Sequence, residues 1–165
     1  MLRADYTLSP PVGPTFNFTS LPPDLSVLTG LQSLSLPGQH ILGGTVPQEY
    51  STLTLLTHLS LGCTDFDNLV TGTLPDNWWT LENMKSFSLS RMNLLTGSLP
   101  DWWYAWYYME SLSLVNLNSI TGTLPPDWGY FWYYTSFTLG EWGRRVEGTT
   151  PGLLWVSGGK GGAWS

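Results

Sequence analysis

Residues 74–98 read LPDNWWTLENMKSFSLSRMNLLTGS, and residues 99–123 repeat the same frame as LPDWWYAWYYMESLSLVNLNSITGT. The frame begins with a hydrophobic-Pro pair and ends with a Gly-Thr or Gly-Ser pair. It extends in both directions, with spacings of 25, 28, 25 and 25 residues between the hydrophobic-Pro pairs Leu21-Pro22, Val46-Pro47, Leu74-Pro75, Leu99-Pro100 and Leu124-Pro125. Five units in one register predict a stacked repeat protein, because no single unit can bury its apolar face alone.

Each part of the unit predicts a local structure. Twelve residues after each proline lies the centre of an h-x-x-h-x-h motif (h, hydrophobic), at Leu34, Leu59, Phe87, Leu112 and Phe137. Alternation of this kind predicts a short strand with two side chains on one face. Glycine permits a tight bend before the next proline, and the proline starts a helical or 3-10 segment.

Apolar residues at the third, sixth and ninth positions after each proline have the three-residue period of a 3-10 coil laid against the sheet. They are Leu25/Leu28/Leu31, Tyr50/Leu53/Leu56, Trp78/Leu81/Met84, Trp103/Trp106/Met109 and Trp128/Phe131/Tyr134.

The frame resembles the leucine-rich repeat, in its longer plant-type class. Three units also carry Leu-Pro-x-x-Trp, at 74–78, 99–103 and 124–128, which is similar to the repeats of kinetoplastid (trypanosome and Leishmania) surface antigens and proteophosphoglycans. We therefore expect an α/β-type solenoid: a right-handed superhelix with a short parallel β-sheet on its concave face and 3-10 or short helical segments on its convex face. The asparagine usual after the strand is replaced by Gln39, Thr64, Met92 and Leu117, so no regular asparagine ladder is expected, and the cysteine-rich caps of many extracellular members are absent.

The expected organisation has three parts. Residues 1–20 are a degenerate N-terminal repeat, since Tyr6-Thr7-Leu8 keeps the spacing of a strand to Pro22. Residues 21–140 hold five repeats (about 21–45, 46–73, 74–98, 99–123 and 124–148), and 149–165 form a partial repeat and a Gly-rich tail. The C-terminal segment offers no clear polar cap, so we expect the chain to be a piece of a longer protein.

Composition excludes several function classes. Charged residues make up 11% of the chain and the net charge is −6, so a nucleic-acid partner is not expected. Cys63 is the lone cysteine, which excludes an intramolecular disulfide and a cysteine-based zinc site. We expect no cofactor, no metal and no transmembrane segment. The first residues lack an apolar signal core, and a cell-surface or secreted location follows from the resemblance alone.

Strand positions between the core residues form the first candidate binding surface, on the concave face. Small hydroxyls there either keep a curved sheet soluble or form an array that hydrogen-bonds an extended ligand such as a glycan or a protein loop. The ten residues are Ser33, Ser35, His58, Ser60, Ser86, Ser88, Ser111, Ser113, Ser136 and Thr138.

Aromatic residues outside the predicted core form the second candidate, a partner or sugar site on the convex face of the last two units. Contiguous exposed apolar surface is typical of docking sites, although several of these rings have the alternative of packing between coils. They are Trp102, Tyr104, Tyr107, Tyr108, Tyr130, Trp132 and Tyr133.

Chemistry-bearing groups are sparse. His58, Cys63, Asp65 and Asp67 form one mixed cluster, with nothing to fix them as converging ligands. Acids recur in register after the prolines, at Asp24, Asp76, Asp101 and Asp127, as turn or helix-start residues do. Asn17-Phe18-Thr19 is a glycosylation sequon, relevant if the parent protein is secreted.

We therefore predict a non-enzymatic recognition module that binds a protein or carbohydrate partner, as part of a larger surface protein. The main alternative is a structural spacer that extends a surface coat without a ligand. Hydroxyl-array binding to ice or polysaccharide is a third interpretation, which a serine-rich rather than threonine-rich face fits poorly.

Overall fold

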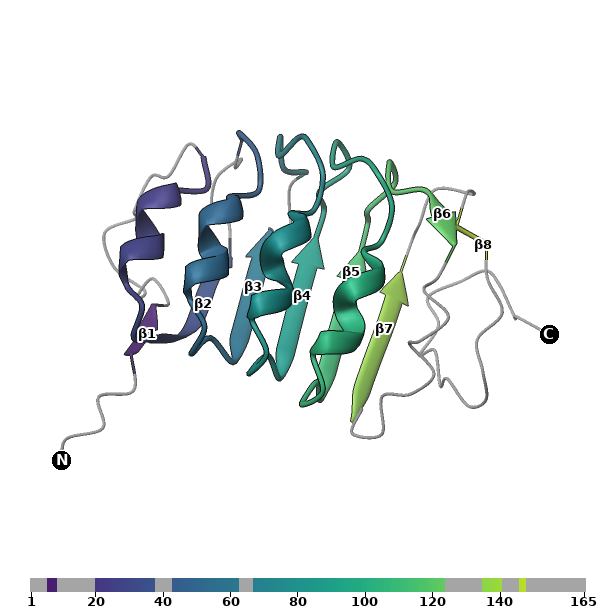
Figure 1. The fold of residues 1–165 in the computed structure, drawn as a ribbon. Helices are drawn as coiled ribbons and strands as arrows, with labels where there is room; N and C mark the ends of the chain where they lie inside the picture. Colours follow the sequence, from purple (N-terminus) through teal and green to yellow (C-terminus); the bar gives the residue numbers. More distant parts are fainter. Residues whose placement is uncertain are drawn as a thin grey trace, which may run out of the picture.

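A computed structural model of the 165-residue chain describes residues 6–8, 20–37, 43–62, 67–123, 135–140 and 146–147. Within these residues one motif recurs: a strand, a loop, a short 3-10 helix and a return to the next strand. Figure 1 shows the coils following one another in a row, with the 3-10 helices on one side of the sheet. This is the predicted solenoid architecture.

The main sheet is parallel throughout, and its strand order follows the chain: β1-β2-β3-β4-β5-β7. These strands are β1 (Tyr6–Leu8), β2 (Leu31–Pro37), β3 (His58–Gly62), β4 (Ser86–Ser90), β5 (Ser111–Val115) and β7 (Ser136–Gly140). The short strands β6 (Gly122–Thr123) and β8 (Val146–Glu147) pair separately. The 3-10 helices are η1 (Pro23–Val27), η2 (Gln48–Thr52), η3 (Asp76–Thr80) and η4 (Asp101–Ala105).

The strands align with the register of the sequence repeat. Leu34 pairs with Leu59, Leu59 with Phe87, Phe87 with Leu112, and Leu112 with Phe137. The prediction that these positions are neighbours is confirmed. β1 adds a parallel strand beside β2, with a register irregularity at Tyr6/Thr7, whereas the repeat boundaries themselves stay a prediction.

The core lies between the sheet and the 3-10 helices and follows the three-residue period. In units two to four, every residue at the third, sixth and ninth position after the proline is at most 2% exposed. The first unit differs, because Leu25 is half-buried and Leu28 is 41% exposed. The prediction of a core position is wrong for Leu28, because η1, unlike η2, η3 and η4, has no 3-10 helix before it in the described part of the chain to pack against. Trp128, Phe131 and Tyr134 lie outside the described residues.

Buried aromatic rings link successive coils. Tyr50 and Trp78 stack with centroids 6.2 Å apart. The Tyr50 hydroxyl donates to the Pro22 carbonyl oxygen at 3.0 Å, and Trp78 Nε1 donates to the Pro47 carbonyl oxygen at 3.2 Å, in each case one coil back. Burial, with a smaller effect from Glu49, raises the pKa of Tyr50 well above its ordinary value.

A second hydrogen-bond ladder runs through the Thr-Gly pairs before each proline. The backbone N–H groups of Thr71, Thr96 and Thr121 donate to the glycine carbonyl of the preceding coil at 2.7 to 2.8 Å, and the threonine hydroxyls donate to the same oxygens. Gly97 has φ +90°, and a Cβ there would lie 3.1 Å from Thr73 Cγ2. Glycine is therefore favoured at this position by its backbone conformation, and a larger side chain would also crowd Thr73 of the preceding coil.

Apolar side chains occupy the position after the strand at which leucine-rich repeats usually have asparagine. Met92 and Leu117 are fully buried there, and the residues before them, Arg91 and Asn116, have positive φ. In the coil of β3, buried Asn68 donates to the carbonyl oxygens of Ser90 and Arg91 at 3.2 and 3.3 Å. Apolar packing, supplemented by Asn68, thus holds this side of the stack. Gln39 and Thr64 lie outside the described residues.

Candidate functional site

The first candidate surface, which we call the sheet face, is made of the ten small polar residues between the core positions of β2, β3, β4, β5 and β7. Strand register arranges them in two straight rows across five coils. One row is Ser33, His58, Ser86, Ser111 and Ser136, and the other is Ser35, Ser60, Ser88, Ser113 and Thr138.

Chemically the sheet face is uniform. Eight of the ten side chains are half-buried, and His58 and Ser136 are exposed. His58 Nδ1 lies 2.8 Å from the Thr57 hydroxyl, within hydrogen-bond distance. Charged residues flank the strands: Lys85 and Glu110 precede β4 and β5 and pair at 3.1 Å (Nζ to Oε1), and Arg91 follows β4. The rows offer regularly spaced hydroxyls without an anchor side chain, and serine is under-represented among binding hot spots.

The described part of the second candidate surface lies on η4 and in the turn that follows it. Tyr104, Tyr107 and Tyr108 are 52%, 69% and 59% exposed, as an outward position on the 3-10 side predicts. Trp102 differs: it is half-buried against the core, with its ring 6.1 Å from Trp103 and 5.4 Å from Trp106. Tyr130, Trp132 and Tyr133 lie outside the described residues, as does Asn17.

Trp102 is half-buried because the second position after the proline faces the preceding coil. Asn77 occupies that position one unit earlier, and its Nδ2 donates to the Gln48 carbonyl oxygen and the Ser51 hydroxyl, both at 3.1 Å. Trp102 at the equivalent place turns its ring toward η3. The ring contacts of Trp102 with Trp103 and Trp106 lie within its own coil, so packing of these rings between coils stays a prediction.

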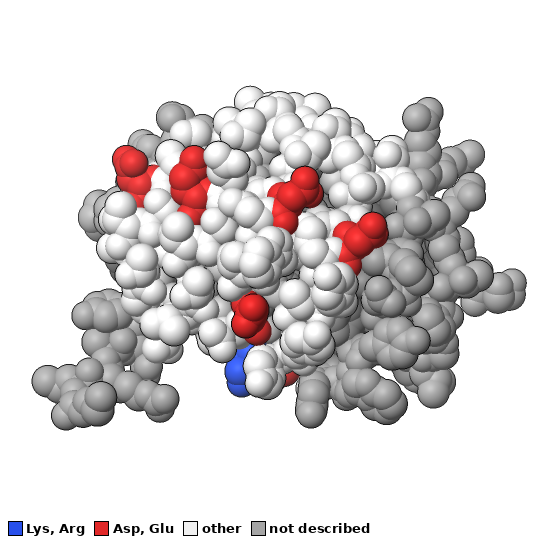
Figure 2. Space-filling view, in the orientation of Figure 1, with Lys and Arg blue, Asp and Glu red and all other residues white. Residues whose placement is uncertain are grey.

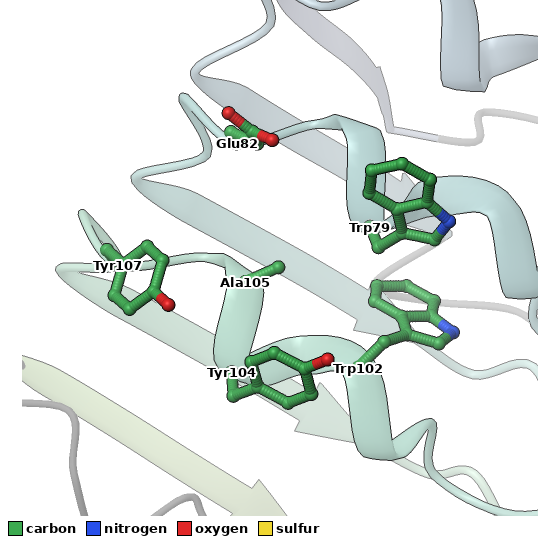
Figure 3. Close-up of a pocket in the computed structure, with 6 residues that line it drawn as sticks. All are labelled: Trp79, Glu82, Trp102, Tyr104, Ala105 and Tyr107. Atoms are coloured by element: carbon green, nitrogen blue, oxygen red, sulfur yellow. The ribbon is translucent and has the colours of Figure 1, made fainter.

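A shallow, open hollow of about 400 Å³ lies where η3 and η4 meet. Its lining, which we call the aromatic hollow, consists of Trp79, Glu82, Trp102, Tyr104, Ala105 and Tyr107. Figure 3 shows the Trp79 and Trp102 rings beside each other from adjacent coils, with Ala105 between them and Tyr107, and Glu82 at the rim. Ala105 is the smallest of these side chains. Because larger side chains surround it, the space above its methyl group stays open.

Trp79 is a member of the aromatic hollow that the sequence analysis missed. Its indole is 50% exposed, while the adjacent Trp78 is fully buried. A signal was available, because Trp79 is four residues after Pro75 just as Tyr104 is four residues after Pro100. The two residues therefore take the same outward direction in neighbouring coils.

The surface around the aromatic hollow carries acidic rather than basic groups. The first turns of the four 3-10 helices hold Asp24, Glu49, Asp76 and Asp101, all exposed. Figure 2 views the molecule from this side and shows acidic side chains spread over a mainly uncharged surface. Of the basic residues in the described part of the chain, Lys85 pairs with Glu110, and Arg91 lies 3.8 Å from Asp67.

The described residues provide little for covalent or metal chemistry. No three His, Cys, Asp or Glu side chains among them lie close enough to hold a metal ion. Cys63 and Asp65, two members of the mixed cluster, lie outside the described residues. No helix in the described ranges is both long and apolar enough to cross a bilayer.

Comparison with known proteins relates the chain to leucine-rich repeat structures. No protein-family model matches the sequence, and no curated protein matches it. Among solved structures, the fold is similar to the LRR ectodomain of the plant membrane receptor kinase GASSHO1/SCHENGEN3 from Arabidopsis thaliana in complex with CASPARIAN STRIP INTEGRITY FACTOR 2. The TM-score is 0.67 and the identity 26%, over 80% of this chain and 15% of that one.

Two further structures agree. The LRR ectodomain of the receptor kinase SOBIR1 from Arabidopsis thaliana matches with a TM-score of 0.58 and 22% identity, over 78% of this chain and 66% of that one. The Arabidopsis receptor kinase HAESA, in complex with the peptide hormone IDA and the co-receptor SERK1, matches with a TM-score of 0.63 and 18% identity. That match covers 74% of this chain and 20% of the HAESA chain. The predicted leucine-rich repeat solenoid is confirmed, and the chain spans less than two thirds of each of these structures. The kinetoplastid part of the resemblance stays a prediction.

Proposed function

We propose that the chain is a non-enzymatic recognition module that binds a protein or peptide partner through the aromatic hollow. The observation that carries this proposal is the exposure of Trp79, Tyr104 and Tyr107 around one hollow. Monomeric proteins seldom leave contiguous aromatic area exposed without a partner, and tryptophan and tyrosine are enriched among binding hot spots.

The structural neighbours support a ligand-binding role. The GASSHO1/SCHENGEN3 structure is that of a receptor-kinase ectodomain in complex with CASPARIAN STRIP INTEGRITY FACTOR 2. A leucine-rich repeat ectodomain therefore binds a ligand in that protein. The present chain matches 15% of its length. A glycan remains an alternative ligand, because exposed indole and phenol rings also stack on sugar rings. A larger, surface-exposed parent protein follows from the kinetoplastid resemblance and belongs to the same proposal.

A structural spacer is the second candidate function. The two rows of the sheet face favour it, since nine small hydroxyl side chains and His58 repeat across five coils. A spacer needs coils that stack and stay soluble, and these rows meet that need. It does not account for the aromatic hollow, which adds apolar surface that a spacer would have to keep from aggregating.

Selection from a random peptide library displayed on phage separates the two functions. The bait is the folded wild-type chain, and the counter-screen is a triple variant, Trp79→Ser, Tyr104→Ser and Tyr107→Ser. These three substitutions change side chains that are at least half exposed, so folding is expected to persist and is checked by circular dichroism.

A matched variant of the sheet face, Ser60→Ala with Ser88→Ala and Ser113→Ala, serves as the control. The proposal predicts enriched peptides that bind the wild type and the sheet-face variant and that lose binding to the hollow variant. Failure to enrich any peptide, with a glycan array also negative, would favour the spacer. Peptides lost with the sheet-face variant alone would move the site to the opposite face.

A further inference from the structure

We infer that the aromatic hollow receives an arginine side chain from an extended segment of its protein partner, stacked on Trp79 and paired with Glu82. The inference rests on the proposed function and specifies the chemistry of the ligand. It is carried by three features: the exposed rings, a rim carboxylate and the acidic residues that begin the two flanking 3-10 helices.

The rings provide faces for a planar cation. Trp79, Tyr104 and Tyr107 are 50%, 52% and 69% exposed and border an open volume of about 400 Å³. A cation within about 6 Å of such a ring centroid is attracted to its negative face, and tryptophan gives the largest attraction. Ala105 lies between the rings in Figure 3, so a side chain entering the hollow meets a methyl group rather than another ring.

Glu82 supplies the negative charge at the rim. Its side chain lines the hollow and is exposed, and no hydrogen bond or ion pair of its carboxylate occurs within the described ranges. An exposed carboxylate on the rim of a hollow lined by aromatic rings matches the guanidinium group, which stacks through its plane and donates two parallel hydrogen bonds from its edge. Lysine lacks both the plane and the fork, so arginine is the better fit.

The surrounding charge favours a cationic segment over a neutral or acidic one. Asp76 and Asp101 begin the two 3-10 helices that flank the hollow, and the whole chain has a net charge of −6. The described cations are engaged elsewhere, since Lys85 pairs with Glu110 and Arg91 lies near Asp67. A partner segment with several arginines therefore meets acids on either side of the hollow, whereas a neutral sugar would make no use of them.

The experiment compares two octapeptides with arginine or citrulline at alternate positions. Citrulline keeps the shape and planarity of arginine and removes its charge. Binding of fluorescein-labelled peptides is measured by anisotropy at low and at physiological salt, with cellohexaose as a neutral glycan competitor. The protein variants are Glu82→Gln, Trp79→Ser and Asp24→Asn; the last removes the same charge from the same side of the molecule but in η1, away from the hollow.

The inference predicts binding of the arginine peptide that weakens as salt rises. Glu82→Gln lowers its affinity about threefold and Trp79→Ser about fivefold, as expected for exposed ion pairs and cation–π contacts. Asp24→Asn leaves the affinity unchanged, and the citrulline peptide binds at least tenfold more weakly.

Four results overturn the inference: equal binding of the two peptides, equal losses in Glu82→Gln and Asp24→Asn, displacement by cellohexaose, or no binding of the arginine peptide. None of these decides the proposed function, which the unbiased peptide library tests without assuming any charge.

Discussion

The adjacent residues Trp78 and Trp79 provide a direct test of how the repeat assigns side chains to core and surface. Trp78 is fully buried, stacks 6.2 Å from Tyr50 and meets Phe87 edge-on at 6.2 Å. Its Nε1 donates to the Pro47 carbonyl oxygen at 3.2 Å. Trp79 is 50% exposed and lines the aromatic hollow. We predict that Trp78→Ala strongly destabilises the fold and that Trp79→Ala does not.

The magnitude follows from burial and hydrogen bonding. Truncation of a buried tryptophan to alanine costs about 3–5 kcal/mol, through lost transfer free energy and the cavity left behind. That range includes about 1 kcal/mol for the hydrogen bond to the buried side of the preceding coil. Typical domains are stable by about 5–15 kcal/mol, so Trp78→Ala removes a large share of the free energy of unfolding. An exposed position away from such features changes it by about 0.5 kcal/mol.

Urea titration followed by far-ultraviolet circular dichroism measures both variants under one set of conditions. The expected result is a clear fall in the midpoint for Trp78→Ala and a midpoint near that of the wild type for Trp79→Ala. Equal destabilisation by the two substitutions, or a larger loss for Trp79→Ala, would refute the three-residue period from which the core and the hollow are both derived.

Three further predictions concern the ladder, the core and the hollow. Gly97→Ala should lower the free energy of unfolding by about 1–2 kcal/mol in urea titration, because φ is +90° and the new Cβ would press on Thr73; an unchanged midpoint would contradict it. Tyr50→Phe should cost about 1 kcal/mol at pH 8 by removing the hydrogen bond to Pro22. Above its ordinary pKa of 10.0 the unfolded wild type loses the Tyr50 proton while burial keeps it in the folded state, so wild-type stability falls with pH. The gap to Tyr50→Phe then closes by up to about 1.4 kcal/mol per pH unit, and a gap that stays constant up to pH 11 would count against the buried hydroxyl. Ala105→Leu should fill the hollow and abolish peptide binding with little change in the urea midpoint, whereas retained binding would place the ligand elsewhere.

Sequence reasoning reached the fold because every structural element has its own residue signal at a fixed place in the unit. The alternation around Phe87 specifies a strand, Gly97 specifies a positive φ, and Trp78 marks the third position after a proline. Since these signals recur in one register, an ambiguous unit is interpreted from its neighbours. The 41% exposure of Leu28 departs from that logic, because the burial of a repeat position also depends on packing against the preceding coil, and no described 3-10 helix precedes η1.

The aromatic hollow was predicted less completely. Tyr104 and Tyr107 were found by excluding core positions, but Trp79 was overlooked and Trp102 was assigned outward. Trp79 was available from its spacing, which matches that of Tyr104 after its proline. The half-burial of Trp102 depends on its ring contacts with Trp103 and Trp106, and its spacing alone contains no information on them. The hollow also needs the small side chain of Ala105, which carries no signal by itself.

Mapping the binding face at residue resolution tests the account most directly. The measurement is a two-dimensional ¹⁵N–¹H spectrum of the chain, recorded during titration with a peptide that the library selects. We expect the indole N–H signals of Trp79 and Trp102 and the backbone signals of Tyr104 and Tyr107 to shift, while those of Ser60, Ser88 and Ser113 stay in place. Shifts confined to the serine rows of the sheet face would contradict the account, even if the peptide binds tightly.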